Sequence, residues 1–177
     1  MTFDTGALLI DVQEKLFPKI YEFEALEKGY NKLLEAFHIL KVPLLVTEQV
    51  PEKLGKTLPS LQPHLSEAHL FEKSTFSAYA TENIRQKIKQ MDRKHWVLFG
   101  IEAHICLYQT ACDLVKNGYR VTVIGNLIGS RFPIDKEIAI QDMRSKEIEI
   151  YSYEMLLFKM LHDSKHPLFK KISSLIV

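Results

Sequence analysis

Short apolar runs alternate with amphipathic stretches along the chain, and this alternation limits the folds that the chain can adopt. Each apolar run has the length of one buried strand, and the stretches between them carry apolar residues at the three- and four-residue spacing of a helix face. The expected strands cover residues 7–10, 44–47, 68–73, 95–99, 120–125 and 148–150. The expected helices cover residues 26–40, 81–91, 107–115, 135–144 and 153–161.

Repeated strand–helix units favour a doubly wound α/β architecture with right-handed crossovers. We therefore expect a three-layer αβα, Rossmann-like fold, in which a mostly parallel six-stranded sheet carries helices on both faces. A chain of 177 residues is long enough to bury one such core, so we expect a single domain over residues 1–177. Ligands of these sheets bind beyond the carboxyl ends of the strands.

Three residues that can carry chemistry stand at expected strand ends. Asp11 closes the first strand, Lys73 closes the third, and Cys106 follows the fourth, where a buried strand turns into a helix. Because the carboxyl ends of parallel strands share one edge of the sheet, we expect these three side chains to gather there.

Together the three residues suit nucleophilic catalysis. The first turn of a helix favours a thiolate, so Cys106 can be a nucleophile. Asp11 would serve as general base and later as acid, while Lys73 would lower the pKa of the cysteine and keep the carboxylate ionised. Backbone N–H groups at the helix start would receive the developing oxyanion. Each residue also has a plainer interpretation: a buried small apolar side chain for Cys106, a turn cap for Asp11, and a solvated loop charge for Lys73.

The charge balance and the cysteines narrow the class of partner and the compartment. The chain has 23 basic and 22 acidic residues, so nothing favours a nucleic-acid or membrane surface, and a small neutral or anionic metabolite fits better. Cys106 and Cys112 stand roughly 9 Å apart along one expected helix, too far for a disulfide. With no signal peptide and no long apolar run, we expect a cytoplasmic protein with reduced thiols.

Three motifs surround the candidate residues: ALLIDVQE at 7–14, FEKSTFS at 71–77 and GIEAHICLYQTA at 100–111. Further matching stretches are VTEQ at 46–49, LGKTLP at 54–59, GYRV at 118–121 and HPLFKKI at 166–172. Together these stretches resemble the isochorismatase-like cysteine hydrolases nearly end to end. By that resemblance, Asp11, Lys73 and Cys106 match the catalytic triad of the family, in agreement with their placement at strand ends.

The resemblance also implies a particular backbone geometry before the nucleophile. The family carries a cis peptide bond there, and the matching bond in this chain joins Ile101 to Glu102. We expect this bond to turn the Glu102 N–H toward the substrate, where it would form an oxyanion hole with the Cys106 N–H. Gln13, Phe76 and Ser77 stand near the motif residues and are weaker candidates for the substrate pocket.

Departures from the family pattern bear on cofactors. The nicotinamidases of this superfamily bind a metal through an Asp-x-His motif after the second strand, whereas this chain reads EQVPEK at 48–53, so we expect no catalytic metal. No glycine-rich phosphate loop follows any strand, so no nucleotide cofactor is expected either. Asn126 stands where the family usually has Asp, and because it lacks the charge we expect the contact that this Asp makes to be weaker here.

Three interpretations of function follow. The first is a cofactor-free cysteine hydrolase, in which Cys106 attacks the carbonyl of a small carboxamide and an acyl-enzyme intermediate forms. The second is a redox-sensing thiol, because a reactive cysteine is also a target of oxidation. The third is a binding or scaffold protein that keeps the fold without turnover. The apolar tail at 168–177 is expected to pack back on the domain or on a second subunit, which favours a homo-oligomer.

Overall fold

The computed structural model describes residues 4–176 and contains one six-stranded parallel sheet in the order β3-β2-β1-β4-β5-β6. Every strand pair is parallel, so the predicted fold class is confirmed. The strands are β1 (Thr5–Ile10), β2 (Leu44–Gln49), β3 (His69–Lys73), β4 (His95–Ile101), β5 (Arg120–Gly129) and β6 (Glu149–Tyr151).

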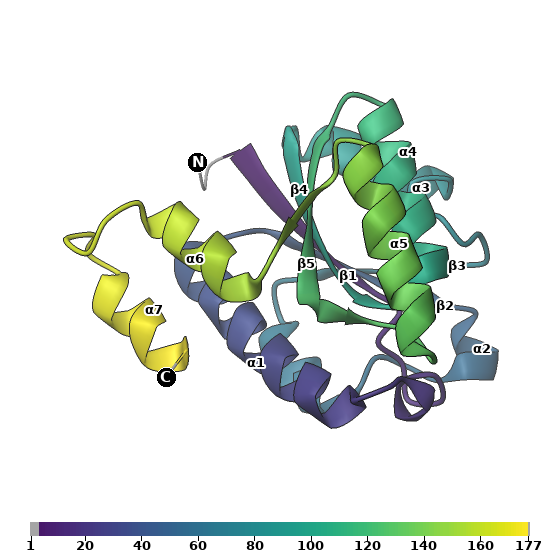
Figure 1. Cartoon of the computed structure of the whole chain (residues 1–177). Helices are drawn as coiled ribbons and strands as arrows, with labels where there is room; N and C mark the ends of the chain where they lie inside the picture. The colour runs from purple at the N-terminus through teal and green to yellow at the C-terminus, as the bar shows by residue number, and fades with distance from the viewer. Residues whose placement is uncertain (1–3, 177) are drawn as a thin grey trace.

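Helices cover both faces of the sheet (Figure 1). One face is covered by α1 (Phe23–Leu40), α6 (Tyr153–Leu161) and α7 (Phe169–Ile176), and the other by α3 (Glu82–Gln90), α4 (Tyr108–Lys116) and α5 (Pro133–Ser145). Shorter turns complete the chain: η2 (Phe17–Lys19), α2 (Pro51–Leu54), η3 (Pro59–His64) and the π-helix η4 (Ala103–Leu107). No helix within residues 4–176 combines the length and the apolar character that a bilayer crossing needs.

The two central strands, β1 and β4, carry continuous apolar runs because side chains on both of their faces are buried. Successive residues of β1 point to opposite faces of the sheet: Ala7 and Leu9 enter the core beneath α1, whereas Leu8 and Ile10 enter the core beneath α4. Both faces of β1 and β4 are therefore buried, as is usual for strands of a parallel sheet.

The fifth strand is longer than the sequence indicates. It continues to Gly129 because the pairing with β4 slips: Leu98 pairs with Val123, but Gly100 pairs with Ile128. The extra residues on β5 form an irregularity of the kind that re-aims side chains near functional sites. As a result, Gly129 pairs with Ile101, and the segment after β5 lies beside the turn that carries Cys106.

The apolar tail packs back on the same chain. Ile172 of α7 is buried in the core beneath α1, and the Lys32 ammonium donates to the Ile176 carbonyl at 3.2 Å. This agrees with the first of the two expected arrangements. Val177, the last residue of the predicted tail, lies outside the described residues.

An alanine substitution at Gly100 of β4 tests how closely β1 and β4 pack. We expect Gly100→Ala to lower the free energy of unfolding by more than about 3 kcal/mol, because Gly100 has φ 129° and a Cβ there would meet the Ile10 carbonyl oxygen at 2.3 Å. Gly118→Ala is the control: Gly118 also has positive φ, 85°, but nothing lies within 4 Å of a Cβ there, so a loss of about 1 kcal/mol is expected. Urea denaturation measures both, and equal losses would contradict the close approach.

Candidate active site

The carboxyl edge of the sheet brings Asp11, Lys73 and Cys106 together. Asp11 follows β1, Lys73 is the last residue of β3, and Cys106 lies in η4, directly after β4. A cavity of about 280 Å³ opens at this edge. Its lining residues are Asp11, Leu16, Lys19, Gln49, Leu54, Phe76, Glu102, Ile105, Cys106 and Arg131.

A buried ion pair forms the floor of the site. The Lys73 ammonium lies 2.7 Å from Asp11 Oδ2, and the two side chains are 0% and 1% exposed. The other oxygen, Oδ1, accepts a hydrogen bond from the Thr47 hydroxyl at 2.7 Å. The Asp11 carboxylate is thus held through both oxygens by two neighbouring strands.

The Lys73 ammonium has further acceptors. It donates to Gln49 Oε1 at 2.6 Å and to the carbonyls of Thr75 and Phe76, each at 3.2 Å. A buried ammonium needs such partners because burial without them would cost several kcal/mol. The position of the Lys73 charge is therefore fixed by two strand ends and by the loop that follows β3.

Gln49 is a site residue that sequence reasoning missed. It closes β2 and lines the cavity, and its side chain connects Lys73 Nζ to the Ser74 carbonyl, which accepts from Nε2 at 2.9 Å. A signal was available in the stretch VTEQ at 46–49, which matches the family pattern and ends in Gln49.

Of the three predicted pocket residues, only Phe76 lines the cavity. Gln13 does not, because both ends of its amide bind backbone: Oε1 accepts from the Gln49 N–H at 2.7 Å, and Nε2 donates to the carbonyls of Gln49 and Gly55. Ser77 is also buried outside the cavity lining. Gln13 thus braces Gln49, and a direct role of Gln13 or Ser77 toward the substrate stays a prediction.

The Cys106 thiol is not predisposed to ionise. Burial raises its pKa, and the Asp11 carboxylate raises it further, to about 12, although the Lys73 ammonium acts in the opposite direction. Lys73 acts in the expected direction, but burial and the Asp11 carboxylate outweigh it, since Cys106 is only 4% exposed. The arrangement suits a thiol that gives its proton to Asp11 as it reacts.

The turn before Cys106 differs from the expected geometry. No cis peptide bond occurs within residues 4–176, so the bond between Ile101 and Glu102 is trans and the prediction of a cis bond is wrong. The chain changes direction at Glu102 instead, which adopts a left-handed conformation with φ 53° and ψ 52°. Its carbonyl accepts the N–H groups of Ile105 at 2.9 Å and Leu107 at 3.3 Å, which starts the π-helix.

The side chain of Glu102 also enters the site, although the sequence had indicated only its backbone. One oxygen, Oε1, lies 3.5 Å from Nε of Arg131, in the segment that the irregular pairing of β5 places beside this turn. A second contact joins the same two segments, because His104 Nδ1 lies 3.0 Å from the Ser130 hydroxyl. Asn126 does not take part: its side-chain oxygen accepts the Tyr153 N–H at the start of α6.

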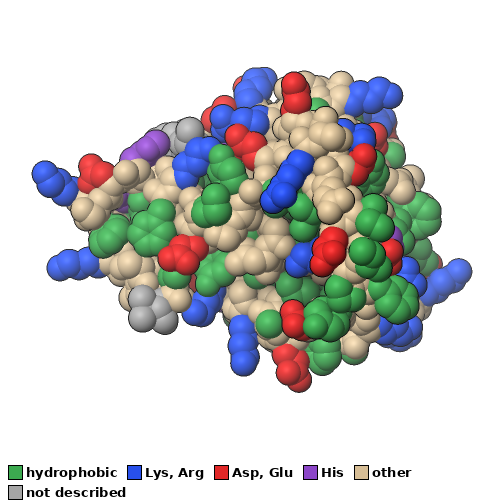
Figure 2. Space-filling view, viewed as in Figure 1, with side chains coloured by type: hydrophobic (Ala, Val, Ile, Leu, Met, Phe, Trp, Pro, Cys, Tyr) green, Lys and Arg blue, Asp and Glu red, His purple; other side chains and the backbone are tan. Residues whose placement is uncertain are grey.

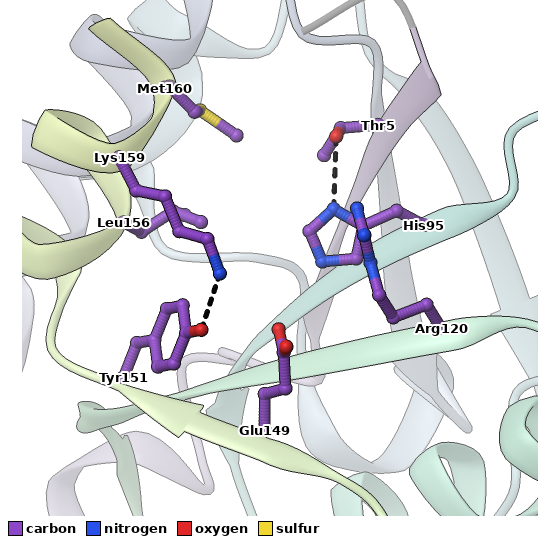
Figure 3. Close-up of a pocket in the computed structure, with 8 residues that line it drawn as sticks. All are labelled: Thr5, His95, Arg120, Glu149, Tyr151, Leu156, Lys159 and Met160. Carbon is purple, nitrogen blue, oxygen red and sulfur yellow. Dashed lines mark hydrogen bonds between the residues drawn. The ribbon is translucent and has the colours of Figure 1, made fainter. Parts of the chain in front are cut away.

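Another polar cluster lies at the opposite, amino-terminal edge of the sheet (Figure 3). His95 connects the hydroxyls of Thr5 and Thr122, and Thr122 in turn donates to Glu149. Burial and the nearby Arg120 lower the pKa of His95 to about 4, so the imidazole is neutral at physiological pH. The enclosed space is about 10 Å³, enough for about one water molecule and too small for a metabolite.

The side chains of residues 4–176 include no group of three or more His, Cys, Asp or Glu placed to hold a metal ion. The chemistry available at the carboxyl edge is that of a thiol and a carboxylate that line one cavity, with an ammonium paired to the carboxylate.

A doubly wound parallel sheet that gathers a cysteine, an aspartate and a buried lysine at its carboxyl edge has the layout of an α/β enzyme. The sequence model of the isochorismatase domain matches residues 5–154. The chain belongs to the isochorismatase family of hydrolases.

Relatives and solved structures agree with this assignment. Isochorismatase domain-containing protein 2 of Danio rerio is 35% identical over 170 residues, which cover 96% of this chain and 85% of the relative. A structure described as MAR1 ribonuclease from Caenorhabditis elegans has a TM-score of 0.93 at 31% identity, covering 99% of this chain and 90% of that one. The YcaC gene product of Escherichia coli, described as an octameric hydrolase of unknown specificity, shares the fold with a TM-score of 0.94 at 17% identity, covering 99% and 87%.

The raised pKa of Cys106 leads to a titration experiment. In a Cys112→Ser background, the rate of alkylation by iodoacetamide should keep rising with pH well above the range of an ordinary thiol, because burial and Asp11 disfavour the thiolate. Asp11→Asn removes the repulsion and leaves Lys73 in place, so the profile should move to lower pH and the rate near pH 8 should rise about tenfold for each unit of pKa lost. An Asp11→Asn profile shifted to higher pH would contradict the account.

The ion pair leads to a stability experiment. Lys73→Met leaves a buried carboxylate without its counter-charge and should lower the free energy of unfolding by about 3–5 kcal/mol. The double variant Asp11→Asn/Lys73→Met should recover at least half of that loss. Lys19→Met, at an exposed lysine of the cavity rim, is the control and should change stability by about 0.5 kcal/mol or less. A loss in Lys73→Met no larger than in this control would show that the pair is not the structural element described.

Proposed function

We propose that this protein is a cysteine hydrolase that cleaves the C–N bond of a small carboxamide through a Cys106 acyl-enzyme intermediate. The observation that carries the proposal is that Cys106 and Asp11 line one cavity, where the buried Lys73 ammonium lies 2.7 Å from the Asp11 carboxylate. This arrangement places a nucleophile, a proton acceptor and a fixed positive charge at one site.

In the proposed acylation step, Asp11 takes the thiol proton as the sulfur attacks the substrate carbonyl carbon. The oxyanion forms next to the N–H of Cys106 in the single turn of η4, where a backbone N–H can stabilise developing negative charge. The C–N bond then breaks, and Asp11 returns the proton to the leaving nitrogen, so that ammonia or an amine departs.

In the proposed deacylation step, water attacks the thioester and Asp11 accepts its proton. The carbon–sulfur bond breaks, the acid is released and the proton returns to the sulfur. The contacts of Lys73 with Asp11, Gln49 and two carbonyls hold the carboxylate in position for each proton transfer.

The cavity supports a small substrate and a mechanism without a metal. Its volume, about 280 Å³, lies near the lower limit of about 300 Å³ for ligand pockets. Both Asp11 oxygens already accept from Thr47 and Lys73, and the Lys73 ammonium holds the position where a cation would otherwise balance the carboxylate. The proposed reaction therefore uses the side chains of the chain itself, with a small molecule as the partner.

Two other activities fit the site less well. RNA cleavage, suggested by the description of the C. elegans structure, requires contacts to several phosphates, whereas this chain has 23 basic against 22 acidic residues. Redox sensing requires a thiol that is largely ionised near neutral pH, whereas burial and Asp11 raise the pKa of Cys106 to about 12.

We also propose that the protein forms a homo-oligomer and works in the cytoplasm. Phe132, Ile134 and Ile138, at the start of α5, are 61%, 58% and 57% exposed, and Figure 2 shows hydrophobic side chains gathered at the lower right of the face where α5 begins in Figure 1. A second copy of the chain would cover such side chains. The two cysteines are free thiols, which suits a reducing compartment.

The direct test measures ammonia release from a panel of small carboxamides, ureides and carbamoyl compounds. The wild type should turn over at least one of them, and Cys106→Ala should lower the rate by more than about 10³-fold because the nucleophile is lost. Cys112→Ser is the matched control, since this half-buried thiol lies outside the cavity, and it should keep the wild-type rate.

An RNA substrate assayed beside the panel separates the alternatives. Ammonia release that persists in Cys106→Ala would contradict the acyl-enzyme proposal. Silence across the whole panel, with RNA cleaved by the wild type, would replace it with a nuclease.

A further inference from the structure

Glu102 presents a buried carboxylate oxygen that has no partner. The side chain is 9% exposed, and its Oε1 faces Arg131 Nε at 3.5 Å. The second oxygen, Oε2, is buried and accepts no hydrogen bond from any group within residues 4–176. A buried carboxylate oxygen without a donor is costly, so its presence at a cavity indicates that a ligand supplies the donor.

Among the described residues, the buried side-chain nitrogens at the cavity already have acceptors. Lys73 Nζ donates to Asp11, to Gln49 and to two carbonyls, and Gln49 Nε2 donates to the Ser74 carbonyl. The cations at the rim, Lys19 and Arg131, are exposed to solvent, and Arg131 faces the other oxygen of Glu102. A molecule bound in the cavity is therefore in a position to supply the donor that Oε2 lacks.

The same carboxylate lies close enough to Cys106 to affect it electrostatically. Asp11 and Glu102 thus place two negative charges around the sulfur, while Lys73 neutralises only the first through direct contact. A substrate group beside the reacting carbonyl meets a hydrogen-bond acceptor and a negative potential. Groups with N–H donors suit this position, and carboxylates do not.

We propose that Glu102 determines specificity: its Oε2 accepts an N–H from the substrate, and the site thereby selects primary amides and ureides over esters and over compounds with a carboxylate at the reacting carbon. This inference rests on the proposed function for its chemistry, but the recognition step can be measured without turnover. An ester offers no N–H and leaves Oε2 unpaired, whereas a carboxylate is repelled by Glu102. Both kinds of compound therefore bind more weakly than an amide, and for both the loss arises at Glu102.

Two alkylating reagents test this recognition on Cys106 itself. Iodoacetamide and iodoacetate react by the same displacement: the sulfur bonds to the CH₂ carbon, the carbon–iodine bond breaks, iodide leaves, and the thiol proton is lost to Asp11 or water. The reagents differ only in carrying a primary amide or a carboxylate beside the reacting carbon. The ratio of their rates cancels the ionisation of the thiol and reports the recognition of that group.

In a Cys112→Ser background, the iodoacetamide-to-iodoacetate ratio at Cys106 should exceed that of N-acetylcysteine by about tenfold or more. Glu102→Gln keeps the size of the side chain and removes the charge, and it should reduce the ratio at least about fivefold. Glu52→Gln is the matched control, an exposed glutamate on α2 with the same change of net charge, and its ratio should equal that of the parent.

Each outcome distinguishes this inference from the proposed function. A ratio that Glu102→Gln leaves unchanged would overturn the inference even if the enzyme hydrolyses amides, and so would failure of both reagents to reach Cys106. A ratio that falls in Glu102→Gln while no amide is hydrolysed would support recognition of N–H groups by Glu102 and would count against the hydrolase proposal alone.

Discussion

The ion pair between Asp11 and Lys73 is the interaction on which the carboxyl edge of this protein depends. It joins the ends of β1 and β3 across β2, whose residues Thr47 and Gln49 complete the contacts of both charges. Such a pair is stable in the interior only when hydrogen bonds satisfy the remaining lone pairs and protons. The loops that follow these strands are consequently held in place by the ion pair. Cys106 lines the same cavity as the Asp11 carboxylate, whose position is fixed.

This arrangement changes how the cysteine can act. A thiol at a helix start usually gains acidity, but here burial and the adjacent carboxylate outweigh the ammonium, and the pKa rises to about 12. A resting thiol resists oxidation and unselective alkylation, and it can be activated only when proton transfer to Asp11 accompanies attack. Reactivity would then depend on a bound substrate that places its carbonyl against the sulfur, which suits an enzyme for small metabolites.

Much of this structure can be predicted from the sequence, because the strands, the helices and the strand ends follow from local patterns. The alternation of apolar runs and helices predicts the parallel sheet, and the rule for strand ends brings Asp11, Lys73 and Cys106 to one edge. Properties that depend on burial or on side-chain direction could not be predicted in this way. The role of Gln13 as a brace, the raised pKa of the thiol and the irregular pairing that brings Arg131 to Glu102 all arise from contacts between distant segments.

The central claim is that Cys106 carries the acyl group. The most direct test is to acid-quench the enzyme during turnover of a small amide and to measure the masses of its proteolytic peptides by mass spectrometry. The account predicts an adduct with the mass of the acyl group on the peptide that contains Cys106, formed within one turnover and lost as the acid product appears. Product formed in a single turnover with no adduct on Cys106, or with the adduct on another residue, would contradict it.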